Sequence, residues 1–349
     1  MIKRPMRFQV SSIGAISYFW LMSFLFLLLV NTPLCSQTTK FIFQRPKMGS
    51  PFIISVFADD SMKVLPIIEK AFHRVDTLNQ IFSDYIETSE ISKLDKKTKD
   101  WQIVSPDLYL ILKISERAYK DSEGAYDVTV SPIVKIWRKA RKSKSMPDKE
   151  ILNAALTKVG FKNIDIDKNL PRIKFKIEGV QLDFGGIVKG FAAQEVVNIL
   201  SKNGYPNCLV DAGGDLAMGT KSNGWKIAIN LPNENTKTLP HFLSLQNQSV
   251  ATSGDMYKYL EYNGKRYSHI VNPKTGLGLT HQRNITVITP DGALADWLAT
   301  ACSVLPIRKA MRLIKKYKNT ELLILENKNG KIKSWQSPNF EKYFELNKA

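Results

Sequence analysis

The spacing of apolar residues along the chain predicts helices and strands in mixed order. Some segments repeat apolar residues with a helical period, begin at Ser or Asp and end near Gly, whereas shorter apolar runs between turn residues indicate strands. Because helices and strands do not alternate regularly, the pattern favours a single α+β domain over a doubly wound sheet. The expected helices begin at residues 60–61 and 105–107 or cover 147–159, 190–202, 293–305 and 306–318; the expected strands cover 52–57, 208–210, 225–230, 249–252, 285–289, 322–325 and 331–335.

The first 36 residues are predicted to direct export. A basic start is followed by a nearly unbroken apolar run over residues 13–30 and by a stretch of small and turn-forming residues over 31–36. This order is typical of a secretory signal peptide. The apolar run is also about long enough to span a membrane, so an uncleaved anchor stays open, and Cys35 leaves a lipoprotein open. In each case we expect an exported body over residues 40–349, either periplasmic or held at the outer face of the cytoplasmic membrane.

The composition is that of a globular protein with a strong positive charge. The chain has 50 Lys and Arg residues against 32 Asp and Glu residues, a formal charge of +18, and 44% hydrophobic residues, which excludes a disordered or fibrous chain. The basic residues are scattered, with the densest run over residues 135–144, and no zinc-finger or RNA-binding signature is present. We therefore expect a solvated basic surface and no nucleic-acid partner. Attraction of anionic ligands or membrane headgroups is the open alternative.

Two of the three cysteines lie in the body of the protein. An oxidising compartment would permit a disulfide between Cys208 and Cys302. However, Cys208 lies in a predicted strand and Cys302 in a predicted buried helix, which favours two inert thiols.

Residues 182–190 form a glycine-rich segment that leads into a predicted helix. Adjacent glycines allow the backbone to approach a ligand closely. The amides at the start of the helix suit an anion, and Lys189 adds a charge that could bind phosphate. A glycine turn with a surface lysine explains the same residues equally well.

Two further segments, residues 210–215 and 251–255, combine glycine with aspartate after predicted strands. Residues 210–215 also fit an ordinary tight turn between strands. His269 follows in a stretch rich in turn residues, where a site on loops is plausible, although a single histidine is more often structural.

Asp296 and Thr300 lie inside the apolar helix predicted over residues 293–305. They are four residues apart and so share one face of the helix. A carboxylate among apolar residues is costly unless it is paired or binds a cation. Carboxylate, hydroxyl and carbonyl oxygens are ligands that suit Mg²⁺, so these residues are candidates for a metal site. The alternative is a carboxylate satisfied by local backbone amides.

Taken in order, these segments resemble the ApbE family of FAD:protein FMN transferases. The resemblance covers about residues 45–340, and its motifs recur in the family's order. They are Met48-Gly-Ser50, Ser83-Asp-Tyr85 with Ser89-Glu-Ile91, Gly124-Ala-Tyr-Asp-Val-Thr129, Asp183 to Gly190, Gly213-Gly-Asp215, Thr252-Ser-Gly-Asp255, His269 to Gly276 and Ala295-Asp-Trp-Leu-Ala-Thr300.

The resemblance implies a single α+β catalytic domain of the T-fold type. It implies cleavage of the pyrophosphate of FAD with Mg²⁺ and transfer of FMN, through a phosphoester, to a Thr or Ser of an exported or membrane flavoprotein, with release of AMP. Several family members hydrolyse FAD to FMN and AMP instead, so an FAD pyrophosphatase stays open. A non-catalytic periplasmic flavin-binding protein is a third possibility.

The resemblance also assigns roles to individual residues. His269 or Asp255 would take the proton of the acceptor hydroxyl; we favour His269, which predicts an essential base with a pKa near the ordinary value of about 6.5, shifted by its surroundings. The predicted Mg²⁺ ligands are Asp296, Thr300 and the carbonyl of Gly186, and the predicted FAD contacts are Met48, Tyr85, Ala125, Tyr126, Asp127, Asp183, Lys189 and Ile270.

Three positions depart from the pattern of the family. Asn272 stands where the family usually has Asp, Gln194 where it usually has Asp, and Gly186 where it often has Ala. A backbone carbonyl ligand survives the change at Gly186. Asn272 loses a charge, which puts a metal or base role at that position in doubt.

Overall fold

The computed structural model describes residues 38–94, 96–97, 99–229, 242–254 and 258–344. The predicted leader over residues 1–36 lies outside the described residues. The chain divides into two compact units, of which the second covers Lys40–Ala349, and the description below concerns that unit. Within the described residues, no helix is both long and apolar enough to cross a membrane.

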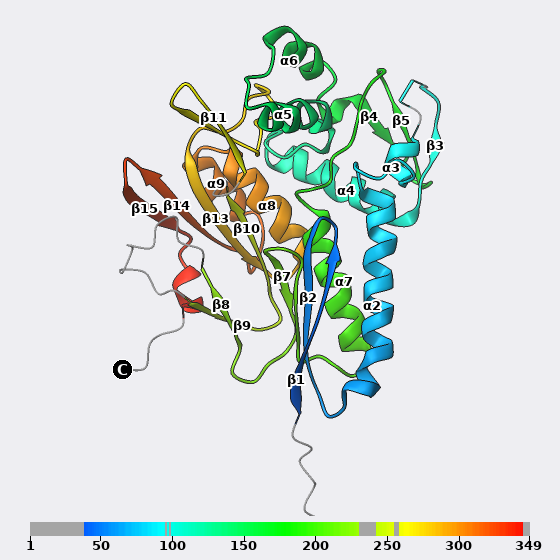
Figure 1. The fold of residues 1–349 in the computed structure, drawn as a ribbon, viewed down its shortest axis with the longest axis vertical. Coiled ribbons are helices and arrows are strands. Elements are labelled where there is room, and N and C mark those ends of the chain that lie inside the picture. Colours follow the sequence, from blue (N-terminus) through cyan, green and yellow to red (C-terminus); the bar gives the residue numbers. More distant parts are fainter. Residues whose placement is uncertain (1–37, 95, 98, 230–241, 255–257, 345–349) are drawn as a thin grey trace, which may run out of the picture. The chain divides into compact units, whose positions relative to one another are not determined.

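An eight-stranded sheet forms the centre of this unit (Figure 1). Strands distant in the sequence lie side by side in it, β2 beside β6 and β10 between β7 and β13, and these pairs are antiparallel. Its strands, in spatial order, are β1 (Thr39–Lys47), β2 (Ser50–Ala58), β6 (Cys208–Asp211), β7 (Asp215–Met218), β10 (Ser249–Gly254), β13 (Gln282–Thr289), β14 (Glu321–Lys328) and β15 (Lys331–Gln336).

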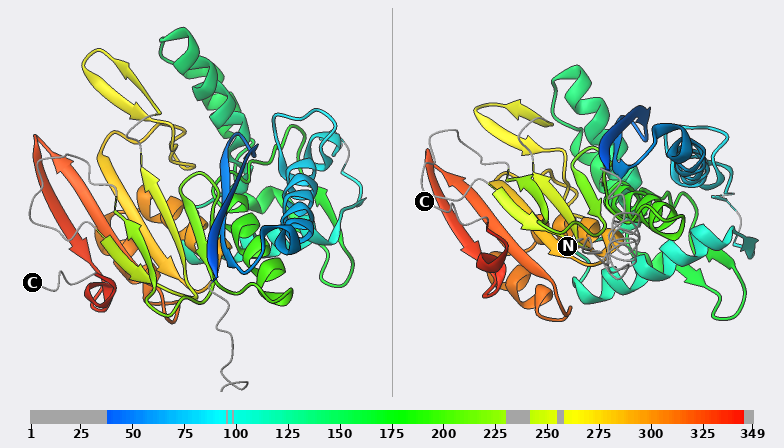
Figure 2. Two further views of the ribbon diagram at one scale, coloured as in Figure 1. Left: turned by 60° about the horizontal axis from the view of Figure 1, so that its bottom comes forward. Right: turned by 90° about the horizontal axis from the view of Figure 1, so that it is seen from below.

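Three helices cover one face of this sheet: α2 (Ser61–Phe82), α7 (Val188–Lys202) and α8 (Gly292–Val304) (Figures 1 and 2). Alternate residues of the strands face these helices, as Phe52, Ile54 and Val56 of β2 do, and are fully buried. This layer contains the main core. It also places the N-terminal ends of α7 and α8 next to strands β7 and β10.

The opposite face of the sheet is partly covered by a smaller layer (Figure 2). It consists of β8 (Trp225–Ala228), β9 (Phe242–Leu245) and the short helix η3 (Phe340–Tyr343), which bury a second apolar cluster against the sheet. Because both faces carry apolar residues, β14 has five consecutive buried positions at its start.

A third apolar cluster joins α5 (Ser131–Ser143) and α6 (Lys149–Leu156) to the hairpin of β11 (Tyr259–Tyr262) and β12 (Lys265–Ser268). The indole nitrogen of Trp137 donates a hydrogen bond of 2.7 Å to the carbonyl of Gly276, so the loop after β12 is fixed to α5. The remaining elements are α3 (Glu90–Lys93), α4 (Pro106–Asp121), α9 (Ile307–Ile314), η1 (Val128–Val130), η2 (Phe161–Asn163) and the sheet of β3 (Gln102–Ile103), β5 (Arg172–Phe175) and β4 (Ile164–Ile166).

The α+β class predicted from the sequence is confirmed, as are the helix starts at Asp60 and Ser105. Their side chains accept hydrogen bonds from the backbone N–H groups of Met62 and Leu108. The turn between β14 and β15 has positive φ at Asn329 and Gly330, as the predicted hairpin requires. Cys208 and Cys302 are free, buried thiols, as expected.

Several boundaries were wrong. The helix expected over 147–159 covers only Lys149–Leu156, and the one expected to end at residue 318 ends at Ile314. Helix α5 and strand β1 were not predicted. In α5 the apolar residues Ile133, Trp137 and Ala140 do follow a helical period, but five Lys and Arg residues within the helix obscure it.

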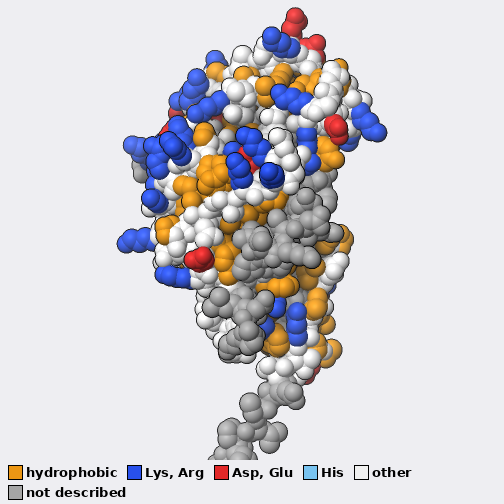
Figure 3. All heavy atoms as spheres, turned by 90° about the vertical axis from the view of Figure 1, so that its left-hand side faces the viewer, with side chains coloured by type: hydrophobic (Ala, Val, Ile, Leu, Met, Phe, Trp, Pro, Cys, Tyr) orange, Lys and Arg blue, Asp and Glu red, His pale blue; other side chains and the backbone are white. Residues whose placement is uncertain are grey.

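Basic side chains are distributed over the surface. Figure 3 shows Lys and Arg side chains across one face with apolar side chains between them, without one continuous basic patch. That distribution agrees on this face with the solvated basic surface expected from the sequence.

Candidate functional site

Helices α7 and α8 touch at a pair of glycines. A Cβ atom built on Gly190 would lie 2.1 Å from the carbonyl oxygen of Gly292 and 2.8 Å from the Cβ of Asp296, and a Cβ on Gly292 would lie 2.1 Å from the oxygen of Gly190. Any side chain at either position would therefore separate the helices. Since Lys189 precedes Gly190 and Asp296 follows Gly292 by one turn, the glycine contact brings a lysine and a carboxylate to the same place.

Asp296 is a buried carboxylate, with 5% of its surface exposed. Its Oδ2 accepts a hydrogen bond of 3.1 Å from the N–H of Gly190 on the neighbouring helix. Burial raises its pKa well above the ordinary value, the negative charge of Asp215 raises it further, and the charge of Lys189 opposes both effects. The sequence left open that local backbone amides satisfy this carboxylate. A backbone amide does bond to it, but that amide belongs to another helix. A bound cation would favour the ionised carboxylate.

Lys189 forms an ion pair with Asp215, the first residue of β7. Burial disfavours the charge of Lys189, but the charges of Asp215 and Asp296 outweigh burial and hold its pKa above the ordinary value. Asp215 follows a tight turn in which Gly213 and Gly214 have positive φ. No role was predicted for this aspartate; the available signal was a carboxylate directly after a Gly-Gly turn.

Thr300 faces the backbone of Gly186, which lies just before α7. A Cβ on Gly186 would lie 2.7 Å from the Oγ1 of Thr300, so alanine here would displace the hydroxyl. The described residues contain no group of three or more His, Cys, Asp or Glu side chains that could hold a metal. A metal at this position would instead use Asp296 with the hydroxyl of Thr300 and the main chain of Gly186, a set of hard oxygens that fits Mg²⁺.

Asp183 lies at the other side of the glycine segment and is held by two donors. Its Oδ1 accepts a bond of 2.8 Å from the N–H of Gly185, and its Oδ2 accepts one of 3.2 Å from Arg138. Arg138 also donates to Asp84 at 2.5 Å, and its Cζ lies 4.3 Å from the ring centroid of Tyr85. Burial and the charge of Asp84 raise the pKa of Asp183, while Arg138 lowers it.

Tyr85 is largely exposed, with 76% of its surface accessible. One face of its ring is covered by Arg138, which the sequence reasoning did not single out. An exposed aromatic ring beside an arginine and two carboxylates is available for stacking on a flat ligand.

Asp127 and its neighbours Ala125 and Tyr126 are buried in the interior of the protein. The Oδ1 of Asp127 accepts hydrogen bonds from the N–H of Thr129 at 2.9 Å and from its Oγ1 at 2.6 Å, which caps η1. Burial raises the pKa of Asp127 to about 6. Ala125 and Tyr126 are buried, and the ring of Tyr126 lies 6.0 Å from that of Trp297. Met48 forms the β1–β2 turn with φ of 51° and is half-buried.

His269 lies in the loop after β12. Its ring Nδ1 is 3.1 Å from the carbonyl oxygen of Lys258, which can only accept, so Nδ1 carries the proton and Nε2 has a free lone pair. Burial, and then the charges of Lys258 and Arg141, lower the pKa of His269 to about 4. In the free protein the surroundings thus shift the pKa of His269 well below the ordinary value of about 6.5 from which the sequence prediction started. Asp255, the alternative base, lies outside the described residues.

The residues next to His269 shape the loop. Ile270 is half-buried, and its N–H donates to the Oγ of Ser268 at 3.0 Å. Asn272 accepts from the N–H of Lys274 at 2.9 Å through its side chain and from that of Gly276 at 2.8 Å through its carbonyl. Asn272 thus stabilises a turn, although Asp would make the same contact, so nothing in the structure explains the uncharged side chain at this departure from the family pattern.

Gln194, another departure, joins α7 to the sheet. Its Oε1 accepts a hydrogen bond of 3.0 Å from the Oγ of Ser249 on β10. The contact does not require a charge, and it holds α7 in place little more than one helical turn after Lys189.

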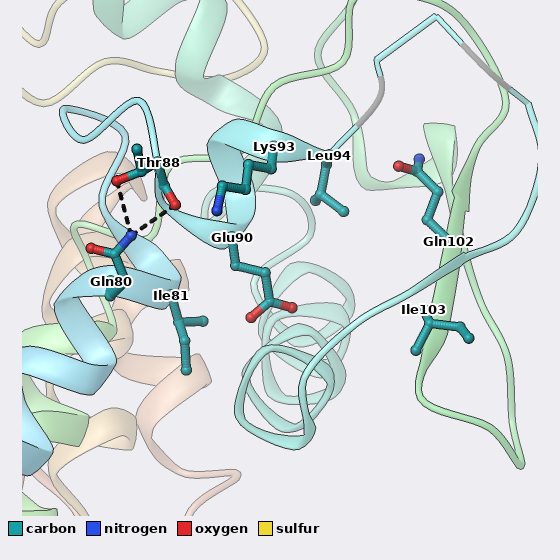
Figure 4. A pocket seen from close by; sticks show the side chains of 8 residues that line it. All are labelled: Gln80, Ile81, Thr88, Glu90, Lys93, Leu94, Gln102 and Ile103. Atoms are coloured by element: carbon teal, nitrogen blue, oxygen red, sulfur yellow. Dashed lines mark hydrogen bonds between the residues drawn. The ribbon is translucent and has the colours of Figure 1, made fainter.

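A cavity of about 430 Å³ lies apart from these residues, between the end of α2, α3 and β3 (Figure 4). Its polar residues are largely used within the fold: Gln80 donates to the carbonyl of Thr88 at 2.7 Å, and Glu90 accepts from the N–H of Ser105 at 2.6 Å. It therefore has a weaker arrangement for chemistry than the cluster around Lys189 and Asp296.

Two groups of predicted site residues are thus brought together. Lys189, Asp296, Thr300 and Gly186 meet where α7 and α8 touch, and Asp183 and Tyr85 meet at Arg138. The charge of Lys189 also contributes to the lowered pKa of His269, so these two lie within electrostatic reach.

The chain is similar to proteins of known family. A model of the ApbE family matches residues 48–324. The FAD:protein FMN transferase of Haemophilus influenzae is 31% identical over 312 residues, 85% of this chain and 90% of that protein, and the one of Klebsiella pneumoniae is 26% identical over 323 residues, 90% and 92%. The solved flavin transferase ApbE from Vibrio cholerae superimposes with a TM-score of 0.79 at 25% identity and covers 88% of this chain and 99% of that one. The ApbE protein from Thermotoga maritima gives a TM-score of 0.78 at 27% identity and covers 88% and 100%. Because the match spans most of the chain, this protein belongs to the ApbE family.

Proposed function

We propose that this protein is a Mg²⁺-dependent FAD:protein FMN transferase. It would cleave the pyrophosphate of FAD, attach FMN through a phosphoester to a Thr or Ser of a flavoprotein and release AMP. The observation that carries the proposal is the buried Asp296, which shares a helix face with Thr300 beside Gly186 and lies within the field of the Lys189–Asp215 pair. Membership of the ApbE family and relatives named as FAD:protein FMN transferases support it.

Asp296, Thr300 and the main chain of Gly186 would hold Mg²⁺. When bound, the ion would neutralise charge on the phosphate oxygens as the bond to AMP breaks. The chain itself supplies position and charge. Lys189 places a cation at the start of α7, where the N–H of Gly190 is already bonded to Asp296. Asp215 keeps that lysine protonated and directed into the site.

His269 would remove the proton of the acceptor hydroxyl through Nε2. The hydrogen bond at Nδ1 selects the tautomer whose Nε2 is a free base, and a pKa of about 4 keeps the imidazole neutral at physiological pH. An incoming phosphate anion would raise that pKa and so strengthen the base when substrate is present.

We also propose an acceptor outside the cytoplasm, an exported or membrane flavoprotein subunit. The support is the order of basic, apolar and small residues over 1–36, which predicts a cleaved leader or a retained anchor. On this proposal the protein acts in the periplasm or at the outer face of the cytoplasmic membrane.

The test is to incubate the purified protein with FAD and Mg²⁺, with and without a flavoprotein acceptor, and to measure AMP and covalent flavin. AMP released only with acceptor, together with flavin on the acceptor, supports the transferase. AMP released equally without acceptor indicates an FAD pyrophosphatase, and binding without any AMP indicates a flavin-binding protein. Removal of Mg²⁺ with EDTA should abolish AMP release in either enzyme.

A further inference from the structure

Helix α5 presents two arginines, Arg138 and Arg141, one turn apart and therefore on the same face. The charge of Arg138 is balanced, because its guanidinium pairs with both Asp84 and Asp183. The two arginines differ sharply in this respect.

Arg141 has no such balance. Its Nη1 is buried and has no hydrogen-bond partner, and no carboxylate among the described residues forms an ion pair with it. Burial, and the like charge of Arg138, lower its pKa, while the nearby Tyr85 opposes this slightly. Arg141 is partly buried, and a buried donor of a guanidinium without a partner is unfavourable unless a ligand compensates it.

The surroundings of Arg141 favour an anion. The groups within its electrostatic reach are Arg138, Tyr85 and His269, and the imidazole of His269 also feels the charges of Lys258 and Lys189. Cations thus converge here from α5, α7 and the segment before β11. Tyr85 adds an exposed aromatic ring, with Arg138 on one face.

We infer that Arg141 binds a phosphate oxygen of the FAD substrate. The inference rests on the proposed function and adds to it a substrate-binding residue. A ligand that combines a flat ring with an anionic group matches a stacking surface at Tyr85 beside an unpaired guanidinium, and FAD has both parts. The charge of the phosphate would also relieve the repulsion between Arg141, Arg138 and the cations near His269.

The test compares FAD with riboflavin, which has the same ring system and no phosphate. Both are titrated by flavin fluorescence into the full chain without Mg²⁺. Arg141→Met should weaken FAD binding about 10- to 100-fold, the effect of losing a charge-assisted hydrogen bond. Riboflavin affinity should change less than about twofold, and Arg141→Lys should recover part of the loss, since a cation remains.

Lys142→Met is the matched control, because Lys142 is the exposed neighbour on the same helix and changes the net charge equally. Its FAD affinity should match the wild type. The melting temperature of Arg141→Met without ligand should be unchanged or higher, because a partly buried charge without an ion-pair partner among the described residues is removed.

Three results overturn the inference. If Arg141→Met binds FAD as tightly as the wild type, Arg141 does not contact a phosphate of FAD. If transfer to the acceptor is nevertheless weaker in that variant, the arginine binds an acidic group of the acceptor instead. Equal losses for FAD and riboflavin, or a lower melting temperature with unchanged FAD affinity, would indicate a structural role. If the wild type binds neither flavin, the proposed function fails and the inference fails with it.

Discussion

The two ends of the candidate site differ in how their charges are balanced. Where α7 and α8 touch, Lys189 is paired with Asp215, and Asp296 adds a second buried carboxylate. Where α5 meets the loop after β12, Arg141 and His269 lie among cations, and no carboxylate of the described part of the chain is paired with either. The first end has excess negative charge and suits a metal ion, whereas the second has excess positive charge and suits an anion. A substrate with a metal-bound phosphate would bring a cation to the first end and an anion to the second.

The largest expected effect is at the metal end. Asp296→Asn should lower the rate of AMP release on the order of 10³-fold or more, because loss of a carboxylate ligand removes several kcal/mol of transition-state stabilisation. The amide still accepts from the N–H of Gly190 and removes a buried like charge, so the melting temperature should not fall. Single-turnover kinetics and thermal melting measure the two effects.

Asp291→Asn is the matched control for that experiment. Asp291 is an exposed N-cap on the same helix, and Asn caps equally well, so activity should be retained. AMP release by Asp296→Asn within tenfold of wild type would exclude Asp296 as a metal ligand.

The second prediction concerns the base at the cationic end. His269→Ala should slow transfer roughly 10²–10⁴-fold while FAD binding persists. His281→Gln is the matched control, since burial also lowers the pKa of His281 to about 4. If His269→Ala transfers FMN at a near-normal rate while Asp255→Asn is inactive, Asp255 is the base and His269 is not.

The pH profile sharpens the same assignment. The active form of His269 is neutral, so kcat/KM should fall only as pH drops toward the pKa of about 4 in the free protein. The acid limb of kcat should lie at higher pH, because bound phosphate raises that pKa. If the acid limbs of the kcat and kcat/KM profiles lie at the same pH, no phosphate is bound near His269 in the complex.

Lys189 tests whether the ion pair is structural or binds substrate. Lys189→Met should weaken FAD binding about 10- to 100-fold and should also lower the melting temperature, because Asp215 loses its partner in a buried position. The double variant Lys189→Met/Asp215→Asn should restore the melting temperature but not FAD affinity. Recovery of both would show that the lysine serves the fold alone.

Gly190→Ala addresses the glycine contact that creates the metal end. A methyl group 2.1 Å from the oxygen of Gly292 must push the helices apart, at an expected cost of about 1–3 kcal/mol in the free energy of unfolding. Lys202→Ala, at the exposed end of the same helix, should cost under about 0.5 kcal/mol. Urea unfolding compares the two, and equal stability of Gly190→Ala and wild type would contradict the tight crossing.

The smallest effect is on acid stability. His269 has a pKa of about 4 in the folded protein and about 6.5 when unfolded, so the unfolded state binds more protons between these values. The free energy of unfolding should therefore fall as pH drops from about 6.5 to 4. His269→Gln should reduce this loss, which chemical unfolding at pH 7 and pH 5 would measure; an unchanged pH dependence would contradict the lowered pKa.

The local features of the protein could be predicted from the sequence because neighbouring residues determine them. The caps at Asp60 and Ser105, the Asn329-Gly330 turn, and the shared face of Asp296 and Thr300 each depend on a few consecutive residues. The order of the short motifs was enough to indicate the ApbE family. Element ends were less accurate, and α5 was missed because its many basic residues hid three well-spaced apolar ones.

The charge balance of the site was decided only by the tertiary structure. The pairing of Lys189 with Asp215, the low pKa of His269 and the unpaired Arg141 all depend on segments far apart in the chain. The sheet order places β7 beside β10, and the contact of Gly190 with Gly292 places two helix ends together. Desolvation and Coulomb interactions act over distances in space, so no local pattern of residues specifies which charges will meet or which will remain without a partner.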